Sequence, residues 1–192
     1  MSATEQKINH AIADWVGDIV ALESHVEEAM DRQLKLTSKN AEVTAAIKHF
    51  HDTVRGSKQR AVAYQGEVGT TAGNPVIKVG TNLLGKAAGL IDMVRRDSVA
   101  KSLRDDYTAY NLLAISYTML HTTAMAMEDG ETQAFAEKGL RTYAKLVQEV
   151  NHLIPLAVVE DLKDNSDQPL RNTNVVDGCR KLIDSVWKST SK

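Results

Sequence analysis

Hydrophobic residues recur along most of the chain at alternating steps of three and four positions, the spacing that places them on one side of an α-helix. One stripe covers Ile8 to Met30, a second covers Val43 to Tyr64, and another covers Phe135 to Leu153. Pro155 is expected to end the last of these helices. Helices with this period pack side by side at shallow angles, so the pattern predicts a helical bundle.

The run from Tyr107 to Met127 contains no Asp, Glu, Lys or Arg. Uncharged runs of this length occur either in membrane spans or in the interior of a protein. In a membrane, seven Thr, Ser, Asn and His side chains of this run would enter hydrocarbon, and no basic cluster sets an orientation. The run therefore predicts a central helix, Ser98 to Met127, that other helices of a soluble protein surround.

A loop rich in Gly, Thr and Asn, residues 65–75, is expected to follow the second stripe, and a weaker, glycine-marked helix is expected from Pro75 to Arg96. A long crossover of this kind is typical of ferritin-like bundles. The predicted fold is all-α, a ferritin-like four-helix bundle with a short extra helix. Residues 1–160 are expected to form the bundle. Residues 161–192 are expected to form a polar linker and a short amphipathic helix, Val175 to Trp187, that docks on the bundle or on a second subunit.

The composition is that of an ordinary globular protein of one domain. The 192 residues are 43% hydrophobic and 25% charged, with a formal net charge of −2. That balance gives no reason to expect nucleic acid or a membrane as the partner. Cys179 is the single cysteine, so neither an internal disulfide nor a thiolate metal cluster can form. The first residues do not resemble a secretion signal, and a cytoplasmic location is expected.

A bundle of this type holds two iron or manganese ions when its helices supply inward carboxylates, one Glu from each of two helices and a Glu-x-x-His pair from each of the others. Glu23 and His51 flank the first and second stripes at mid-helix and can turn inward. Glu149 and His152 have the Glu-x-x-His spacing at the edge of the last stripe. These four residues are the candidate ligands for iron or manganese.

The same positions allow an interpretation without metal, because inward carboxylates are few and tyrosines are frequent. A polar cluster at mid-bundle is expected from Tyr110, Asn111, Tyr117, His121 and Tyr143. Glu23 would then accept hydrogen bonds from tyrosine hydroxyls, His51 or Asn111, and the network would fix the register of the helices. No spacing indicates a nucleophile with its base, so no catalytic residue and no organic cofactor is predicted.

Three short motifs lie along the predicted bundle. They are Asp18-x-x-x-Leu22-Glu23 in the first helix, His49-Phe-His51-Asp52-Thr53 in the second, and Ala114-Ile115-Ser116-Tyr117-Thr118-Met119-Leu120 in the central helix. They resemble the Asp-x-x-x-Ala-Glu, His-x-Glu-Glu-Thr and Ile-Ala-Ser-Tyr-Gly-Thr-Leu patterns of the YciE/YciF-type ferritin-like stress proteins. The resemblance covers about Ile8 to Ile154, together with the order of the helices.

The resemblance implies an antiparallel ferritin-like bundle that forms a homodimer, holds a di-iron site and is linked to stress. Glu23 matches the family's first-helix glutamate. Other residues stand where the family has ligands: His51 for a glutamate, Val54 for a histidine, Tyr110 and Leu113 for acids of the central helix, and Tyr143 near the fourth-helix acid. The resemblance therefore implies a scaffold whose metal centre has been dismantled.

Two hypotheses for function follow. The first is a non-enzymatic, stress-associated helical bundle with a degenerate di-metal site, which acts by self-association or by binding a partner protein. The second is a metal-binding ferritin-like oxidoreductase that uses Glu23 and His51 with iron or manganese. A mid-bundle site with three or more converging acids or imidazoles would favour the second, and a closed tyrosine network would favour the first.

Overall fold

The computed structural model describes residues 3–35, 39–71, 98–165, 169–172 and 174–190. Five helices form there, and no strand occurs in those ranges, which confirms the all-α prediction. They are α1 (Ala3–Gln33), α2 (Ala41–Thr71), α4 (Val99–Ala126), α5 (Gly130–Asn165) and α6 (Val175–Thr190). None of the described helices is long and apolar enough to span a bilayer.

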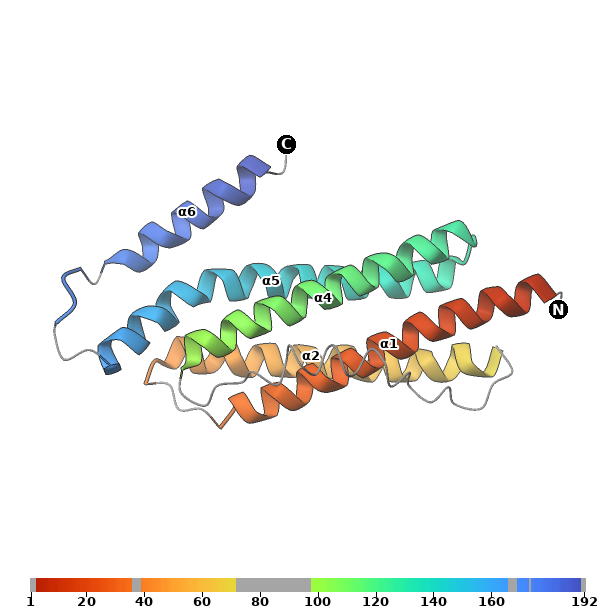
Figure 1. Ribbon diagram of the computed structural model, residues 1–192, viewed down its shortest axis with the longest axis horizontal. Coiled ribbons are helices and arrows are strands. Elements are labelled where there is room, and N and C mark those ends of the chain that lie inside the picture. Colours follow the sequence, from red (N-terminus) through yellow and green to blue (C-terminus); the bar gives the residue numbers. More distant parts are fainter. Residues whose placement is uncertain (1–2, 36–38, 72–97, 166–168, 173, 191–192) are drawn as a thin grey trace.

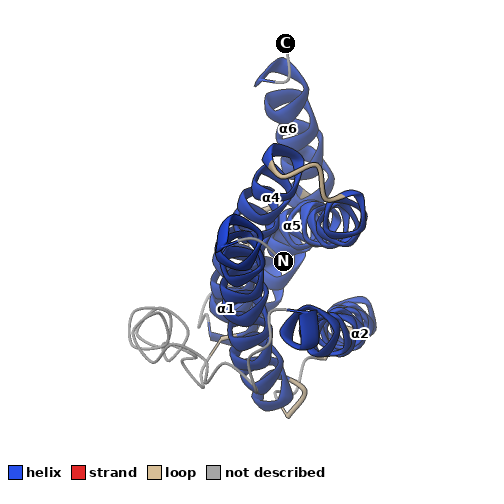
Figure 2. Ribbon diagram, turned by 90° about the vertical axis from the view of Figure 1, so that its right-hand side faces the viewer, coloured by secondary structure: helices blue, strands red, loops and turns tan. Residues whose placement is uncertain are grey.

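Four of the helices lie side by side along the long axis (Figure 1). α1 packs on α2 and α4 packs on α5, while contacts between α1 and α4 and between α2 and α5 close the bundle into a ring. Figure 2 shows this arrangement close to end-on. α2 ends and α4 begins at opposite ends of the bundle (Figure 1), and the crossover predicted between them lies largely outside the described residues. The extra helix expected from Pro75 to Arg96 lies outside the described residues.

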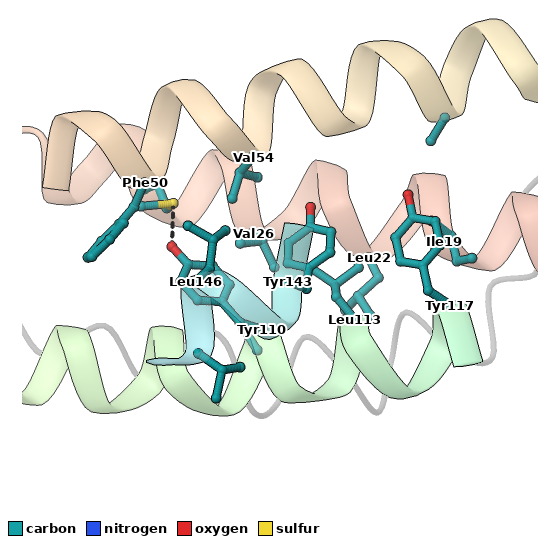
Figure 3. Packing of buried hydrophobic residues seen from close by; sticks show 14 of the residues in the cluster. Ile19, Leu22, Val26, Phe50, Val54, Tyr110, Leu113, Tyr117, Tyr143 and Leu146 are labelled. Atoms are coloured by element: carbon teal, nitrogen blue, oxygen red, sulfur yellow. Dashed lines mark hydrogen bonds between the residues drawn. The ribbon is translucent and has the colours of Figure 1, made fainter. Parts of the chain in front are cut away.

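The predicted stripes form the core. Every member of the stripe from Val43 to Tyr64 is buried, and so are Ile12, Ile19 and Val26 of the first stripe. These side chains meet the inner faces of α4 and α5 in one cluster, part of which Figure 3 shows. Because one regular stripe on each helix faces the same interior, the spacing alone was enough to predict the core.

Two boundaries differ from the predictions. α2 continues to Thr71, into the loop expected at residues 65–75, of which residues 72–75 lie outside the described part of the chain. α5 passes through Pro155 and ends at Asn165, so the polar linker starts later than expected. A proline inside a helix costs one hydrogen bond, and the half-buried Pro155 lies between the buried residues Leu153 and Ala157, whose packing holds the helix together across the break.

The central helix is not surrounded on all sides, which corrects the prediction for Tyr107 to Met127. One face of α4 is buried against α1 and α5, but Ile115 is 57% exposed and Met125 is 58% exposed on the other side. α4 begins with a clear cap, in which the Ser98 side chain accepts a hydrogen bond from the backbone N–H of Lys101. Its uncharged run thus forms two surfaces, and among the described residues only one of them is packed against other helices.

α6 lies apart from the ring and packs against α5 (Figure 1). Val176 and Ile183 are half-buried, as docking on the bundle predicts. Cys179 is exposed, and Trp187 remains 46% exposed. The helix therefore touches the bundle with only part of its apolar side.

Candidate functional site

Glu23 lies at the centre of the bundle and is fully buried. The steps of the first stripe bring it to the inner face of α1, one residue beyond the buried Leu22. Its Oε1 atom accepts three hydrogen bonds from three different helices. The donors are the hydroxyls of Ser57 on α2 (2.7 Å), Tyr117 on α4 (2.9 Å) and Tyr143 on α5 (2.8 Å). One carboxylate oxygen thus connects all four helices of the ring.

The two tyrosines stack on each other with their ring centroids 5.8 Å apart, and Figure 3 shows both hydroxyls pointing toward α1 and α2. Gly139 makes room for this pair, because a Cβ atom at that position would fall on the ring of Tyr117. Burial and the adjacent Glu23 carboxylate raise the pKa of both phenols. The hydroxyls therefore keep their protons and remain donors at neutral pH.

Burial is the largest influence on Glu23 and raises the pKa of its carboxyl group. The three hydroxyl donors and the positive charge of Arg60 act in the opposite direction, and the pKa remains above its usual value. The second carboxylate oxygen, Oε2, finds no hydrogen-bond partner among the described residues. A proton on Oε2 would neutralise the group and leave Oε1 free to accept all three hydroxyls.

Of the residues predicted to cluster at mid-bundle, the structure brings Tyr117 and Tyr143 to Glu23. Tyr110 is fully buried one level further along, where its hydroxyl donates to the sulfur of Met30 (3.1 Å). Asn111 donates to the backbone carbonyl of Tyr107, and His121 is half-buried on α4. The structure does not bring either of them to Glu23.

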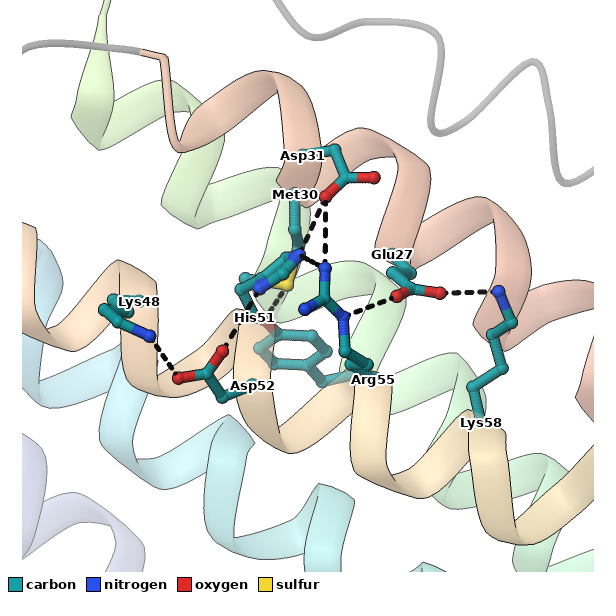
Figure 4. Close-up of polar contacts among 9 residues, drawn as sticks. Glu27, Met30, Asp31, Lys48, His51, Asp52, Arg55 and Lys58 are labelled. Carbon is teal, nitrogen blue, oxygen red and sulfur yellow. Dashed lines mark hydrogen bonds and ion pairs between the residues drawn. The ribbon is translucent and has the colours of Figure 1, made fainter.

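His51 is buried but belongs to a different group of side chains (Figure 4). Its Nε2 atom lies 2.8 Å from Asp31 Oδ1, and its Nδ1 atom lies 3.5 Å from Asp52 Oδ1. Nearby, Glu27 accepts hydrogen bonds from Arg55 (3.1 Å) and Lys58. This network joins α1 to α2 at the edge of the bundle and gives Nε2 of the buried imidazole a partner, whereas Nδ1 makes no hydrogen bond within the described residues.

Glu149 and His152 do not act together, although their spacing fits a metal motif. Glu149 Oε2 lies 3.3 Å from His49 Nε2, whereas His152 Nε2 lies 2.8 Å from Asp184 Oδ1 on α6. Both residues line a cleft of about 860 Å³ between α2, α5 and α6. The described residues contain no group of three or more His, Cys, Asp and Glu side chains that could hold a metal ion.

A second buried acid was missed from the sequence. Asp106 on α4 is 4% exposed and accepts a hydrogen bond from Gln33 Nε2 on α1 (2.6 Å). Burial raises its pKa to about 7, with a further increase from Asp105 and an opposing effect of the Gln33 donor. Asp106 Oδ2 and Gln33 Oε1 both lack partners in the described part of the chain, so a proton on Oδ2 would complete the pair.

Ser57 was also missed as a donor. The sequence did carry a signal for it, because Ser57 is the one serine in the otherwise hydrophobic stripe of α2. Asp106 gave a weaker signal. It follows Asp105, and two adjacent acids before a hydrophobic run suggest a solvated helix end rather than one half-buried and one buried side chain.

Comparison with known proteins supports the fold and nothing beyond it. No family model and no curated protein matches the chain. A solved structure of a protein from Xanthomonas campestris pv. campestris is similar, with 16% sequence identity and a TM-score of 0.65. The match covers 82% of this chain and 97% of that one. At this identity the likeness shows a common helical fold.

Proposed function

We propose that this protein is a non-enzymatic ferritin-like bundle, in which a closed carboxylate–hydroxyl network stands at the place of a di-metal site, and that it acts by self-association or by binding a partner. The observation that carries the proposal is the coordination of Glu23. A single buried carboxylate oxygen takes three hydroxyl donors, one from each of the other helices of the ring. The YciE/YciF-type resemblance adds an expected link to stress.

The donor set argues against iron or manganese at this position. Two such ions require several carboxylates and imidazoles that converge, because hard cations need charged oxygen ligands. Here one carboxylate is joined by three hydroxyls whose protons point at it. The orphaned Oε2 atom of Glu23 is the feature that favours the alternative, a metal-binding oxidoreductase. However, the contacts of His51 are with Asp31, Asp52 and Arg55, so the imidazole that this alternative needs already belongs to another network.

The network has a structural function of its own. Hydrogen bonds to a buried carboxylate are stronger than those between neutral groups, and leaving such a carboxylate unsatisfied costs several kcal/mol. Because the three donors sit on three helices, Oε1 of Glu23 receives all three hydrogen bonds only when all four helices are in place. The centre of the bundle is therefore suited to holding a rigid scaffold, whose outer faces are left for contacts with other molecules.

Metal titration tests the proposal. Protein purified without chelators is titrated with Fe²⁺ and with Mn²⁺ by calorimetry, and bound metal is counted after gel filtration. The expected result is no stoichiometric binding and no catalysed oxidation of Fe²⁺, with Glu23→Ala indistinguishable from the parent in metal content. One or more ions bound per chain, and lost in Glu23→Ala while Glu149→Ala retains them, would overturn the proposal, and catalysed oxidation of Fe²⁺ that is lost in the same variant would establish the oxidoreductase.

A further inference from the structure

The outward side of α4 carries an apolar stripe that nothing in the described structure covers. Ile115 is 57% exposed, Met119 is 42% exposed and Leu112 is 36% exposed. These three residues are three and four positions apart in the sequence, so they lie on one side of the helix, in line with the smaller side chains that precede and follow them. We define the α4 outer face as Thr108, Leu112, Ile115, Met119, Thr122 and Ala126, of which every member is exposed. Contiguous exposed apolar stripes of this kind mark interaction surfaces.

Charge is arranged at the two ends of the α4 outer face and is absent between them. Lys101 and Arg104 are exposed at the start of α4, on the same side of the helix as Thr108, and Arg104 also donates two hydrogen bonds to Asp105 of its own chain. Glu128 and Glu131 are exposed at the other end, where α4 turns into α5. From residue 107 to residue 127 no charged side chain interrupts the stripe. The face is thus basic at one end, acidic at the other and neutral over the roughly 30 Å between them.

We propose that the α4 outer face binds the same face of a second copy of this chain, with the two α4 helices antiparallel. This deepens the proposed function, because it names the surface through which self-association occurs. In an antiparallel pair the basic end of each helix lies over the acidic end of the other, and this attraction occurs twice. A parallel pair would instead place like charges together at both ends.

The side chains also complement themselves about a two-fold axis near the middle of the run. With the axis at the level of residue 117, Ile115 lies opposite Met119 of the partner subunit. Leu112 then lies opposite Thr122 of the partner subunit, and Thr108 lies opposite Ala126 of the partner subunit. The two larger side chains thus meet at the centre, a large one meets a small one at Leu112, and two small ones meet at Thr108, so the helices can approach more closely toward the ends of the stripe. An anionic membrane surface is a poorer occupant, because the acidic end would be repelled.

The oligomeric state tests this interface. Sedimentation velocity at micromolar concentrations is run on the parent chain, on Ile115→Glu and on Leu182→Glu. Leu182 is the matched control, because it is an exposed apolar residue of α6 (62% exposed) outside the proposed face. The parent and Leu182→Glu are expected to be dimers. Ile115→Glu should weaken association at least roughly tenfold, since two-fold symmetry introduces each buried charge twice.

A charge exchange tests the orientation of the two helices. Arg104→Glu is expected to weaken the dimer, and the double variant Arg104→Glu with Glu131→Arg is expected to restore it, because the exchanged ends still meet as opposites when the helices are antiparallel. Circular dichroism checks that each variant folds. If Ile115→Glu does not fold, Thr122→Glu takes its place in the test.

Three outcomes would overturn the interface: a parent chain that remains monomeric, an Ile115→Glu variant that dimerises like the parent, or a Leu182→Glu variant that alone dissociates. None of these results depends on metal. Failure of the interface is therefore distinct from failure of the proposed function, which the metal titration decides.

Discussion

Replacing Asp106 by Asn should make the protein more stable at neutral and alkaline pH and leave it nearly unchanged in acid. Asp106 is buried between α4 and α1, where Gln33 is its hydrogen-bond partner. The carboxylate has one oxygen without a donor, and the amide of Gln33 has one oxygen without a donor. An asparagine keeps the acceptor that Gln33 Nε2 uses and adds an N–H group that can reach Gln33 Oε1. The substitution thus removes a buried charge and preserves the shape of the pair.

The size and sign of the effect follow from the pKa of Asp106. It is about 7 in the folded protein, against 3.8 for an unperturbed carboxyl group. Between these values the folded protein holds a proton that the unfolded chain has lost, so the free energy of unfolding falls as pH rises, by about 1.4 kcal/mol per pH unit. The decline ends once the folded carboxyl group ionises, near pH 7. Over the full interval the loss amounts to about 4 kcal/mol, an order-of-magnitude value.

Urea denaturation at a series of pH values from about 4 to about 8 measures this directly. Asp106→Asn and the parent should have similar free energies of unfolding at the acid end, and the variant should gain steadily until it leads by about 4 kcal/mol at the alkaline end. Glu137→Gln is the matched control, because this carboxylate is exposed and bonded to Arg141 (2.8 Å), and it should show no such gain with pH. A difference between Asp106→Asn and the parent that stays constant with pH, or that grows toward acid, would refute the buried-acid interpretation.

Two further predictions concern the Glu23 network and its packing. Tyr143→Phe removes a donor to the Glu23 carboxylate and should lower the free energy of unfolding by about 2 kcal/mol. Tyr110→Phe removes only a hydrogen bond to a thioether and should lower it by about 1 kcal/mol or less. Equal losses for the two variants in chemical denaturation would contradict this difference between their partners. Gly139→Ala should destabilise the protein by about 1–3 kcal/mol, because the added methyl group overlaps a buried tyrosine ring. Gly66→Ala, at a helical position with nothing within 4 Å, should raise the melting temperature slightly instead, and a neutral Gly139→Ala would show that the ring moves freely.

The helices and their inner faces could be predicted from the sequence because both depend on local spacing. A row of apolar residues at steps of three and four must face the same side of a helix, and four such rows can be buried only against one another. The same spacing placed Glu23 beside the core seam. It also made tyrosines of the other stripes its natural partners, and Tyr117 and Tyr143 are two of the three donors that the structure shows.

The other features depend on the arrangement of helices in three dimensions. An uncharged run shows that its side chains avoid water, but not whether the covering surface comes from the same chain, so the open side of α4 could not be anticipated. The passage of α5 through Pro155 depends on packing contacts on either side of the break. The burial of Asp106 depends on Gln33, which lies 73 positions away in the sequence.

The two buried acids explain how a bundle with such regular stripes adopts one register. Apolar rows with a period near 3.5 residues tolerate a slip of one helical turn, since one aliphatic residue replaces another. The polar pairs do not tolerate it. Glu23 and Gln33 lie ten residues apart on α1, and their partners Tyr117 and Asp106 lie eleven residues apart on α4. These separations correspond to about 15 Å along α1 and about 16 Å along the antiparallel α4. A shift of one turn, about 5.4 Å, would separate both acids from their donors while keeping them buried. Burial of Glu23 and Asp106 therefore lowers the stability of the correct structure, but it lowers the stability of every shifted structure far more.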